Sequence, residues 1–327
     1  MMDISIPYYE DMSRISNSNI GWFLKKGPAY LHAMLTGTAQ GETGPQLQLG
    51  TMIHEYLLQP LEFQKDYVVW DKSRPSSAQQ EKFCEELANS TEIEPNKAIL
   101  SAYKASYRTT GKSEDKCLSE GLKIAEELKD YIQSKKENDG RIKINHFDVN
   151  RLMTIAENIH NHKLADKLVK NEYIGTEDEL HHEFHINWEM NGVKCKSLLD
   201  SVHFDFKNRI CTLVDLKTTS HIGTFEDSMR DFDYLRQLMY YTLAIKWYLE
   251  NERGENVDGW SFEWFIVAID TTGTNEIRVF QFDKEQVESR YDTICSSLND
   301  IHWHQTTNKW DHHKAYYDGN GAEKLSL

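Results

Sequence analysis

Residues 181–217 read HHEFHINWEMNGVKCKSLLDSVHFDFKNRICTLVDLK, and this stretch decides the fold. The dipeptide Asn191-Gly192 is a strong signal for a type I′ hairpin turn, because both residue types tolerate a positive φ. It joins the strand-like run before it to a second run that ends at Phe204. A further polar turn then leads into the apolar residues 210–217. The stretch therefore predicts three consecutive antiparallel strands.

Two carboxylates and a lysine belong to neighbouring strands of this predicted sheet. Because side chains alternate along a strand, Asp215 and Lys217 share one face, and Asp200 on the preceding strand can meet Asp215. Close carboxylates repel one another unless a cation lies between them, and such oxygen ligands suit Mg²⁺ or Mn²⁺. Lys217 would then orient a metal-bound water or stabilise charge on an attacked phosphate. The alternative is a solvated ion pair, which the apolar neighbours in LVDLK disfavour.

A helix with apolar residues around much of its circumference is predicted after residue 233. Gln237 and Tyr241 are four residues apart and therefore lie on one face of it. Polar groups in a buried helix need hydrogen-bond partners, which a metal-bound water, a phosphate or Lys217 would supply. The simpler alternative is a core tyrosine whose hydroxyl is satisfied within the protein.

The residues that directly follow the lysine are Thr218, Thr219 and Ser220. Hydroxyl and backbone amide groups at the end of a strand can bind phosphate. We therefore interpret this tripeptide as a candidate contact to DNA.

In their order and spacing, these residues resemble the motifs of the PD-(D/E)XK nucleases of the RecB type, and most closely those of the RecE-like phage exonucleases. The segment Gly50 to Pro60, with the pattern G-x-x-x-H-x-x-L-L-x-P, resembles the histidine motif of the same nucleases. The resemblance implies that His54 and the Leu216 carbonyl complete the metal shell of the two aspartates. It also implies that Glu183 is a further site residue.

Each of these assignments has a plainer alternative. A single histidine on an apolar helix, such as His54, is more often a core or surface residue, and the adjacent Glu55 is expected to point away and be exposed. His181, His182 and His185 lie on a strand with alternating faces and have no second pair of ligands, so we do not assign them to zinc.

The order of predicted elements is helices, three strands, a helix, two strands and a last helix. This order indicates an α/β fold, and the resemblance implies a restriction-endonuclease-like core with a mixed central sheet flanked by helices, plus an N-terminal helical region. We expect one nuclease domain with four parts. They are N-terminal helices with the histidine motif (1–62), a mainly helical insertion (63–175), a catalytic core (176–310) and a tail (311–327).

The composition is that of an ordinary soluble enzyme, apart from its charge. The net charge of −15 is unfavourable for contact with DNA phosphates, although bound metal would offset part of it. The five scattered cysteines lack CxxC spacing, which indicates reduced thiols in a cytosolic protein and argues against an iron–sulfur cluster. No apolar run is long enough to span a membrane, and the acidic start does not read as a signal peptide.

The predicted function is a Mg²⁺-dependent exodeoxyribonuclease that hydrolyses linear double-stranded DNA. The resemblance implies 5′ to 3′ digestion in phage-type recombination, a RecT-like single-strand annealing partner, a homo-oligomeric ring and, for a phage-encoded protein, the cytoplasm of the bacterial host. Two alternatives stay open. One is a non-catalytic DNA- or protein-binding module with a nuclease-like fold, and the other is a PD-(D/E)XK endonuclease.

Overall fold

The computed structural model describes residues 7–41, 44–169, 178–319 and 321 of the 327-residue chain. The chain divides into two compact units, of which the first comprises Met1–Pro60 with Leu152–Leu327 and the second Leu61–Arg151. The second unit falls almost entirely within the span predicted as a helical insertion, and it ends before that span does.

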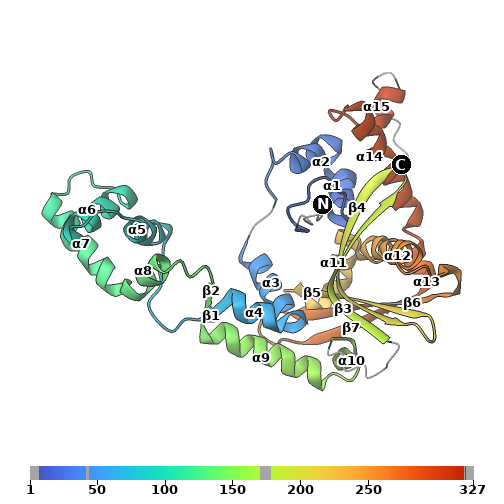
Figure 1. Cartoon of the computed structure of the whole chain (residues 1–327), viewed down its shortest axis with the longest axis horizontal. Helices are drawn as coiled ribbons and strands as arrows, with labels where there is room; N and C mark the ends of the chain where they lie inside the picture. Colours follow the sequence, from blue (N-terminus) through green and yellow to red (C-terminus); the bar gives the residue numbers. More distant parts are fainter. Residues whose placement is uncertain (1–6, 42–43, 170–177, 320, 322–327) are drawn as a thin grey trace. The chain divides into compact units, whose positions relative to one another are not determined.

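A five-stranded mixed sheet forms the centre of the first unit (Figure 1). Its strands, in spatial order, are β3 (Asp178–Met190), β4 (Val193–Asp205), β5 (Ile210–Thr219), β6 (Ser261–Asp270) and β7 (Ile277–Phe282). Neighbouring strands are antiparallel except β5 and β6, which are parallel and are separated in the chain by helices. The predicted α/β class with a mixed central sheet is confirmed.

The β3–β4 connection is the turn that the sequence predicts. Asn191 and Gly192 have φ values of 53° and 75°, as both central residues of a type I′ turn require. Pairing then runs without a slip from Met190 opposite Val193 to Asp178 opposite Asp205. This tight turn fixes which residues of β3 and β4 lie opposite one another, and it therefore sets the geometry of the site described below.

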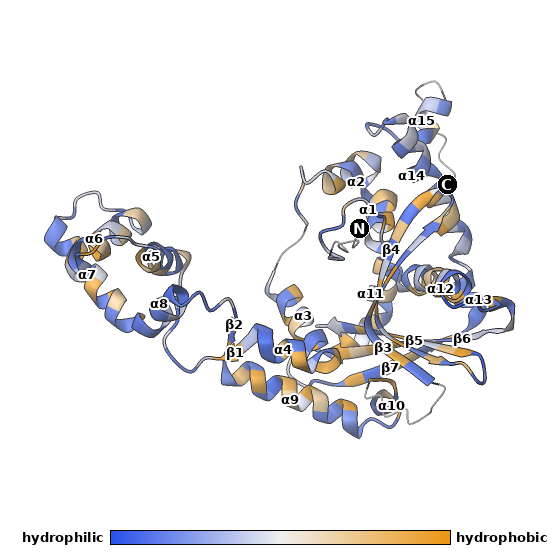
Figure 2. Cartoon of the chain, in the orientation of Figure 1, coloured by the Kyte–Doolittle hydropathy of each residue, from blue (hydrophilic) through white to orange (hydrophobic). Residues whose placement is uncertain are grey.

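The helix α12 (Tyr234–Asn251) provides the other half of the core. It contains no glycine or proline, and ten of its side chains are buried. It packs on β3 and β4 and against α14. Figure 2 shows hydrophobic residues concentrated along the strands of the sheet on which α12 packs. The other helices of this unit are α1 (Asn17–Lys26), α2 (Pro28–Leu35), α3 (Pro45–Leu58), α10 (Ala165–Val169), η1 (Ile222–Thr224), α11 (Phe225–Phe232), η2 (Val257–Gly259), α13 (Lys284–Glu288), α14 (Tyr291–Thr307) and α15 (Lys314–Asp318).

A short N-terminal segment lies along the edge of β4. β5 pairs only with the end of β4 from Ser201 onward, so the earlier part of that edge is open to another partner. Ile15 takes this place, because its N–H donates to the Lys194 carbonyl and its own carbonyl accepts from the Lys196 N–H. The buried Lys196 ammonium, whose residue is 6% exposed, donates to the backbone carbonyls of Tyr8 and Asp11.

The second unit is a small helical body with its own core. Its elements are α4 (Pro60–Asp66), β1 (Tyr67–Val69), α5 (Ala78–Ala88), α6 (Pro95–Ser106), α7 (Glu114–Glu127), α8 (Lys129–Lys136), β2 (Ile142–Ile144) and the start of α9 (His146–Asn161). β1 and β2 pair in parallel. Gly121 on α7 allows close approach to α6, because a Cβ there would lie 2.8 Å from Ile99 Cγ2.

Some predicted helices differ from the observed ones. The apolar stripe over residues 119–136 predicts one helix, whereas α7 and α8 are separate and meet at Leu128, which caps both. The predicted helix over residues 147–170 corresponds to α9 and α10 with a turn between them, and residue 170 lies outside the described residues. The expected polar tail contains one short helix, α15. Within the described ranges, no helix has the length and apolar character needed to cross a membrane.

Candidate active site

Three adjacent strands each contribute a carboxylate at the same level of the sheet. Glu183 and Asp200 lie opposite one another, since the pairs on either side of them are consecutive in the β3–β4 register. Asp215 on β5 is the next position beyond the Ser201–Val214 pair, so the register places it beside Asp200. The sequence analysis expects Asp200 to meet Asp215 if their strands pair with the usual twist, and the β4–β5 register brings these two positions side by side.

The regular geometry of the hairpin changes at these carboxylates. In β4 the odd-numbered residues are buried from Val193 to Ser201, together with Lys196, and from Val202 onward the even-numbered residues are buried instead. Glu183 itself has a φ of 48°, in the left-handed region that non-glycine residues rarely adopt. Such a conformation costs on the order of 1 kcal/mol and persists where surrounding structure holds it, frequently at functional sites.

His54 reaches this row from the N-terminal helix α3. Its Nδ1 lies 3.7 Å from Asp200 Oδ2, and one ligand atom from each of His54, Glu183 and Asp200 lies within 4.8 Å of the other two. Gly50 allows α3 to come this close, because a Cβ at that position would lie 3.1 Å from the Thr218 hydroxyl. An imidazole nitrogen and two carboxylates are a donor set that fits a divalent cation.

Asp215 is held by its neighbours and is not among these three ligand atoms. It is 2% exposed, its Oδ2 lies 2.6 Å from Lys217 Nζ, and its Oδ1 accepts a hydrogen bond of 2.9 Å from the Gln237 amide. The same amide donates to the Tyr241 hydroxyl at 2.9 Å. Gln237 and Tyr241 therefore anchor the Asp215–Lys217 pair from α12.

The charges of the site favour a cation. Burial, together with the charges of Asp200, Glu55 and Asp215, raises the pKa of Glu183 from 4.5 to about 8. Burial also raises the pKa of Asp215 to about 6, although Lys217 opposes this shift. Burial alone would lower the pKa of Lys217, but the carboxylates of Asp215 and Asp200 outweigh it and raise that pKa above its usual value. The Lys217 ammonium thus faces the buried carboxylate of Asp215 and the half-buried carboxyl group of Asp200.

Leu216 and Thr219, two of the remaining predicted residues, have hydrogen-bond partners within the protein. The Leu216 backbone N–H donates to Asp200 Oδ2 at 2.7 Å, which orients this carboxylate. Thr219 accepts backbone and hydroxyl hydrogen bonds from Thr271 through its carbonyl, while its own hydroxyl accepts from the His221 N–H. Ser220 ends the same segment, directly after β5.

Sequence reasoning misplaced or missed several neighbours of the site. The expectation that Glu55 points away and is exposed is wrong, because Glu55 is half-buried and close enough to raise the pKa of Glu183. Tyr234 was not predicted, yet Lys217 Nζ lies 5.0 Å from the centre of its ring. Desolvation by neighbouring atoms and then the charges of Glu183, Asp200 and Glu55 raise the pKa of Tyr9, although its side chain is 75% exposed; the N-terminal segment therefore also lies near the carboxylates.

A mixed sheet with carboxylates on adjacent strands, followed by a lysine two residues beyond the last, defines the fold of the PD-(D/E)XK nuclease superfamily. The chain belongs to the family described as a PDDEXK-like domain of unknown function (DUF3799), whose profile matches residues 16–317. The predicted superfamily is confirmed, and the finer RecE-like assignment stays a prediction.

A similar fold occurs in a solved structure from Eubacterium rectale described as "Putative exonuclease". The match covers 100% of this chain and 97% of that one, with a TM-score of 0.52 and 13% sequence identity. At this identity the likeness concerns the fold alone. No curated protein matches the chain.

Proposed function

We propose that the protein is a metal-dependent deoxyribonuclease that hydrolyses phosphodiester bonds at the ends of linear double-stranded DNA. The observation that carries the proposal is the cluster of His54, Glu183 and Asp200 beside the Asp215–Lys217 ion pair. A structural ion pair would not require two further half-buried acids and an imidazole at the same place. This arrangement of donors fits Mg²⁺ or Mn²⁺ and leaves coordination positions for water and a phosphate oxygen.

His54, Asp200 and Glu183 would hold the ion, with Asp215 and the Leu216 carbonyl as the further ligands that the family resemblance implies. A bound ion of this kind supplies Lewis-acid polarisation of the phosphate and lowers the pKa of a water molecule. The proton on Glu183 and the cation compete for the same carboxylate, since the pKa of Glu183 is raised to about 8.

Lys217 is suited to stabilise charge rather than to accept a proton. Its raised pKa keeps it as an ammonium at neutral pH, and its partner Asp215 fixes its position 2.6 Å away. From there it can donate a hydrogen bond to the attacking water or to a phosphate oxygen. Gln237 and Tyr241 keep Asp215 in place, and Thr218 to Ser220 are the proposed backbone contacts to DNA.

The finer features of the function rest on the RecE-like resemblance. They are digestion from 5′ to 3′, a role in phage-type recombination, a single-strand annealing partner, a ring-shaped homo-oligomer and a cytoplasmic location. Polarity is tested with duplexes labelled at either the 5′ or the 3′ end of one strand. Early release of the 5′ label as mononucleotides supports the proposed direction, and early release of the 3′ label contradicts it.

The activity itself is tested on linear and covalently closed circular DNA with Mg²⁺, Mn²⁺ or EDTA. We expect loss of linear DNA only, and only with metal. Asp200→Asn should abolish cleavage while preserving the circular dichroism spectrum, and Glu189→Gln, an exposed acid on β3, is the matched control. Cleavage of circles would identify an endonuclease. Inactivity of the wild-type protein with every divalent metal, or normal cleavage by Asp200→Asn, would overturn the assignment and favour a binding module.

A further inference from the structure

The negative charge of the chain is unevenly distributed between the two units. Residues 61–151 contain 16 lysines and arginines against 17 aspartates and glutamates, so nearly all of the net charge of −15 belongs to the other unit. Phosphate groups bind where cations exceed anions locally, because attraction to the nucleic acid backbone is electrostatic. The second unit therefore repels nucleic acid less than the first unit does.

Most lysines of this unit are already neutralised by carboxylates. Lys97 Nζ lies 2.7 Å from Glu94, Lys104 forms an ion pair with Glu114, and Lys112 forms one with Glu120 at 2.5 Å. From the sequence, residues 93–116 could form either a basic face or a solvated helix, and the solvated helix is favoured; the ion pairs of Lys97, Lys104 and Lys112 agree with it.

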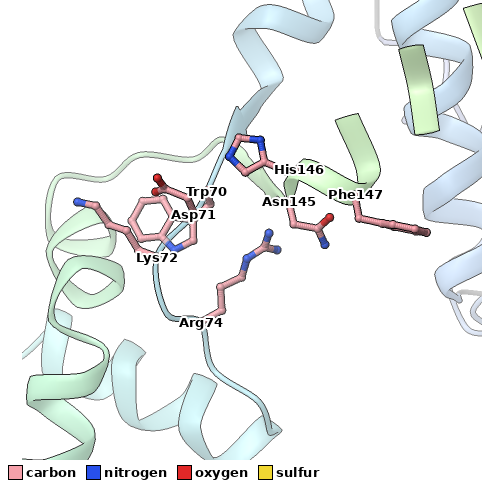
Figure 3. Close-up of a pocket in the computed structure, with 7 residues that line it drawn as sticks. All are labelled: Trp70, Asp71, Lys72, Arg74, Asn145, His146 and Phe147. Carbon is pink, nitrogen blue, oxygen red and sulfur yellow. The ribbon is translucent and has the colours of Figure 1, made fainter. Parts of the chain in front are cut away.

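A pocket of about 600 Å³ at the ends of β1 and β2 differs from that surface (Figure 3). Its lining combines aromatic, cationic and amide groups with one acid. The lining residues are Trp70, Asp71, Lys72, Arg74, Asn145, His146 and Phe147. Figure 3 shows the Arg74 guanidinium pointing into the space between the strand ends, toward Asn145 and His146.

Arg74 is held in place without being neutralised. Its Nη1 donates to the Lys143 carbonyl on β2 at 2.7 Å, and no carboxylate of a described residue lies within ion-pair distance of its guanidinium. Lys143 has a lowered pKa, because burial and the positive charges of Lys135 and Arg141 outweigh the opposing charge of Asp139. Lys143 and Lys72 also lie 5.2 Å and 5.7 Å from the centre of the Trp70 ring. Arg74 and Lys143 thus add cationic groups at the pocket, while Lys72 is paired with Asp130 at 3.2 Å and Asp71 is the one acid among the lining residues.

Phe147 adds a surface on which a base can stack. Its side chain is 72% exposed at the start of α9, which is unusual for a phenylalanine that serves only to pack. An aromatic ring open to solvent on the rim of a pocket that also holds a fixed guanidinium offers partners for the two components of a nucleotide, a flat base and a phosphate. In a duplex the bases are stacked on each other and cannot reach such a ring, whereas in a single strand they can.

We propose that this pocket binds single-stranded DNA, with a base stacked on Phe147 and a phosphate bound by Arg74. The inference rests on the proposed function, since digestion of one strand from a duplex end leaves the other single-stranded. It adds a second contact to DNA that is separate from the carboxylate cluster.

The test measures binding of a fluorescein-labelled oligodeoxythymidylate to the full chain in EDTA by fluorescence anisotropy. Phe147→Ala should weaken binding roughly tenfold, as loss of one stacked base does. Arg74→Gln should weaken binding and lower the slope of log K against log salt by about 0.7. The matched control is Ile93→Ala with Lys97→Gln, which removes an exposed apolar side chain and a cation elsewhere in the same unit and should leave binding unchanged.

Equal affinities of the wild-type protein, the pocket variants and the control would overturn the proposal, as would tighter binding of a matched duplex or RNA. Thermal melting checks that Phe147→Ala, a change at an exposed site, preserves the fold. Cleavage by the Asp200→Asn variant separates the two proposals. If binding depends on Phe147 but no metal supports cleavage by the wild-type protein, the proposed DNA-binding pocket is supported and the proposed nuclease function is refuted. If cleavage depends on Asp200 but binding does not depend on Phe147, only the proposed DNA-binding pocket is refuted.

Discussion

Replacing Glu183 by glutamine tests whether the carboxylate cluster is built for a cation. Burial and neighbouring negative charge raise the pKa of Glu183 from 4.5 to about 8. Between these values the folded protein holds a proton that the unfolded chain has released. The contribution to stability is therefore present at low pH, falls as pH rises from 4.5 to about 8, and stays low above that. Glutamine has no such proton, so this part of the pH dependence should disappear.

The size of the effect follows from the shift. Without metal, the raised pKa of Glu183 should lower the free energy of unfolding by between about 3 and 5 kcal/mol at pH 9 and by only about 1 kcal/mol at pH 5, because one pKa unit corresponds to about 1.4 kcal/mol. Glu183→Gln should therefore gain stability over the wild-type protein as pH increases. The exposed Glu189 on the same strand provides the control, since Glu189→Gln should follow the wild-type curve.

The assay is urea unfolding in EDTA at pH 5 and pH 9, followed by circular dichroism. Excess Mn²⁺ should stabilise the wild-type protein at pH 9 and reduce its difference from Glu183→Gln, because a ligand that binds only the folded state adds to its stability. Identical pH dependence of the wild-type protein and Glu183→Gln, or equal stabilisation of both by Mn²⁺, would refute the reasoning.

Three further changes probe the surroundings of the carboxylates. Lys217→Met should keep the apolar stem but remove the charge that faces the phosphate, and single-turnover cleavage should fall by about a hundredfold or more, whereas retained activity would exclude Lys217 from the reaction. Tyr241→Phe removes the hydroxyl that accepts a hydrogen bond from the Gln237 amide, and it should cost about 1 kcal/mol of stability. It should also lower kcat with little change in KM, and steady-state kinetics measures the two constants separately. Gly50→Ala should favour the helix by about 1 kcal/mol, but it places a methyl group 3.1 Å from the Thr218 hydroxyl, so cleavage should drop. The double variant Gly50→Ala with Thr218→Ala removes this clash, and its cleavage should return to the level of Thr218→Ala alone.

Much of the central sheet could be predicted because its signals are local. The Asn191-Gly192 turn sets the β3–β4 register, and a period of two places Asp215 and Lys217 on one face. The spacing of four on a helix likewise brings Gln237 and Tyr241 together, and their hydrogen bond of 2.9 Å follows from it. These patterns involve residues that are near one another in the chain.

The rest depends on contacts between distant segments. The left-handed backbone of Glu183 could not be predicted, because a glutamate rarely adopts a positive φ and nothing in its neighbours signals one. Glu55 was predicted to be exposed because a single helix does not reveal which strands will cover it. The bridge from Ile15 to Cys195 involves one residue pair, so it leaves no periodicity to detect.

The bridge between Ile15 and Cys195 makes the N-terminal segment important for the solubility of the protein. Ile15 and the residues before it cover backbone groups of β4 that β5 does not reach, and the carbonyls of Tyr8 and Asp11 solvate the Lys196 ammonium. Trimming by a protease beyond Ile15 would expose a bare strand edge, the kind of surface that recruits strands from other molecules and leads to aggregation. The same cut would leave the buried Lys196 ammonium without its two carbonyl partners. Shortened protein should therefore aggregate under conditions in which its helix content is still unchanged.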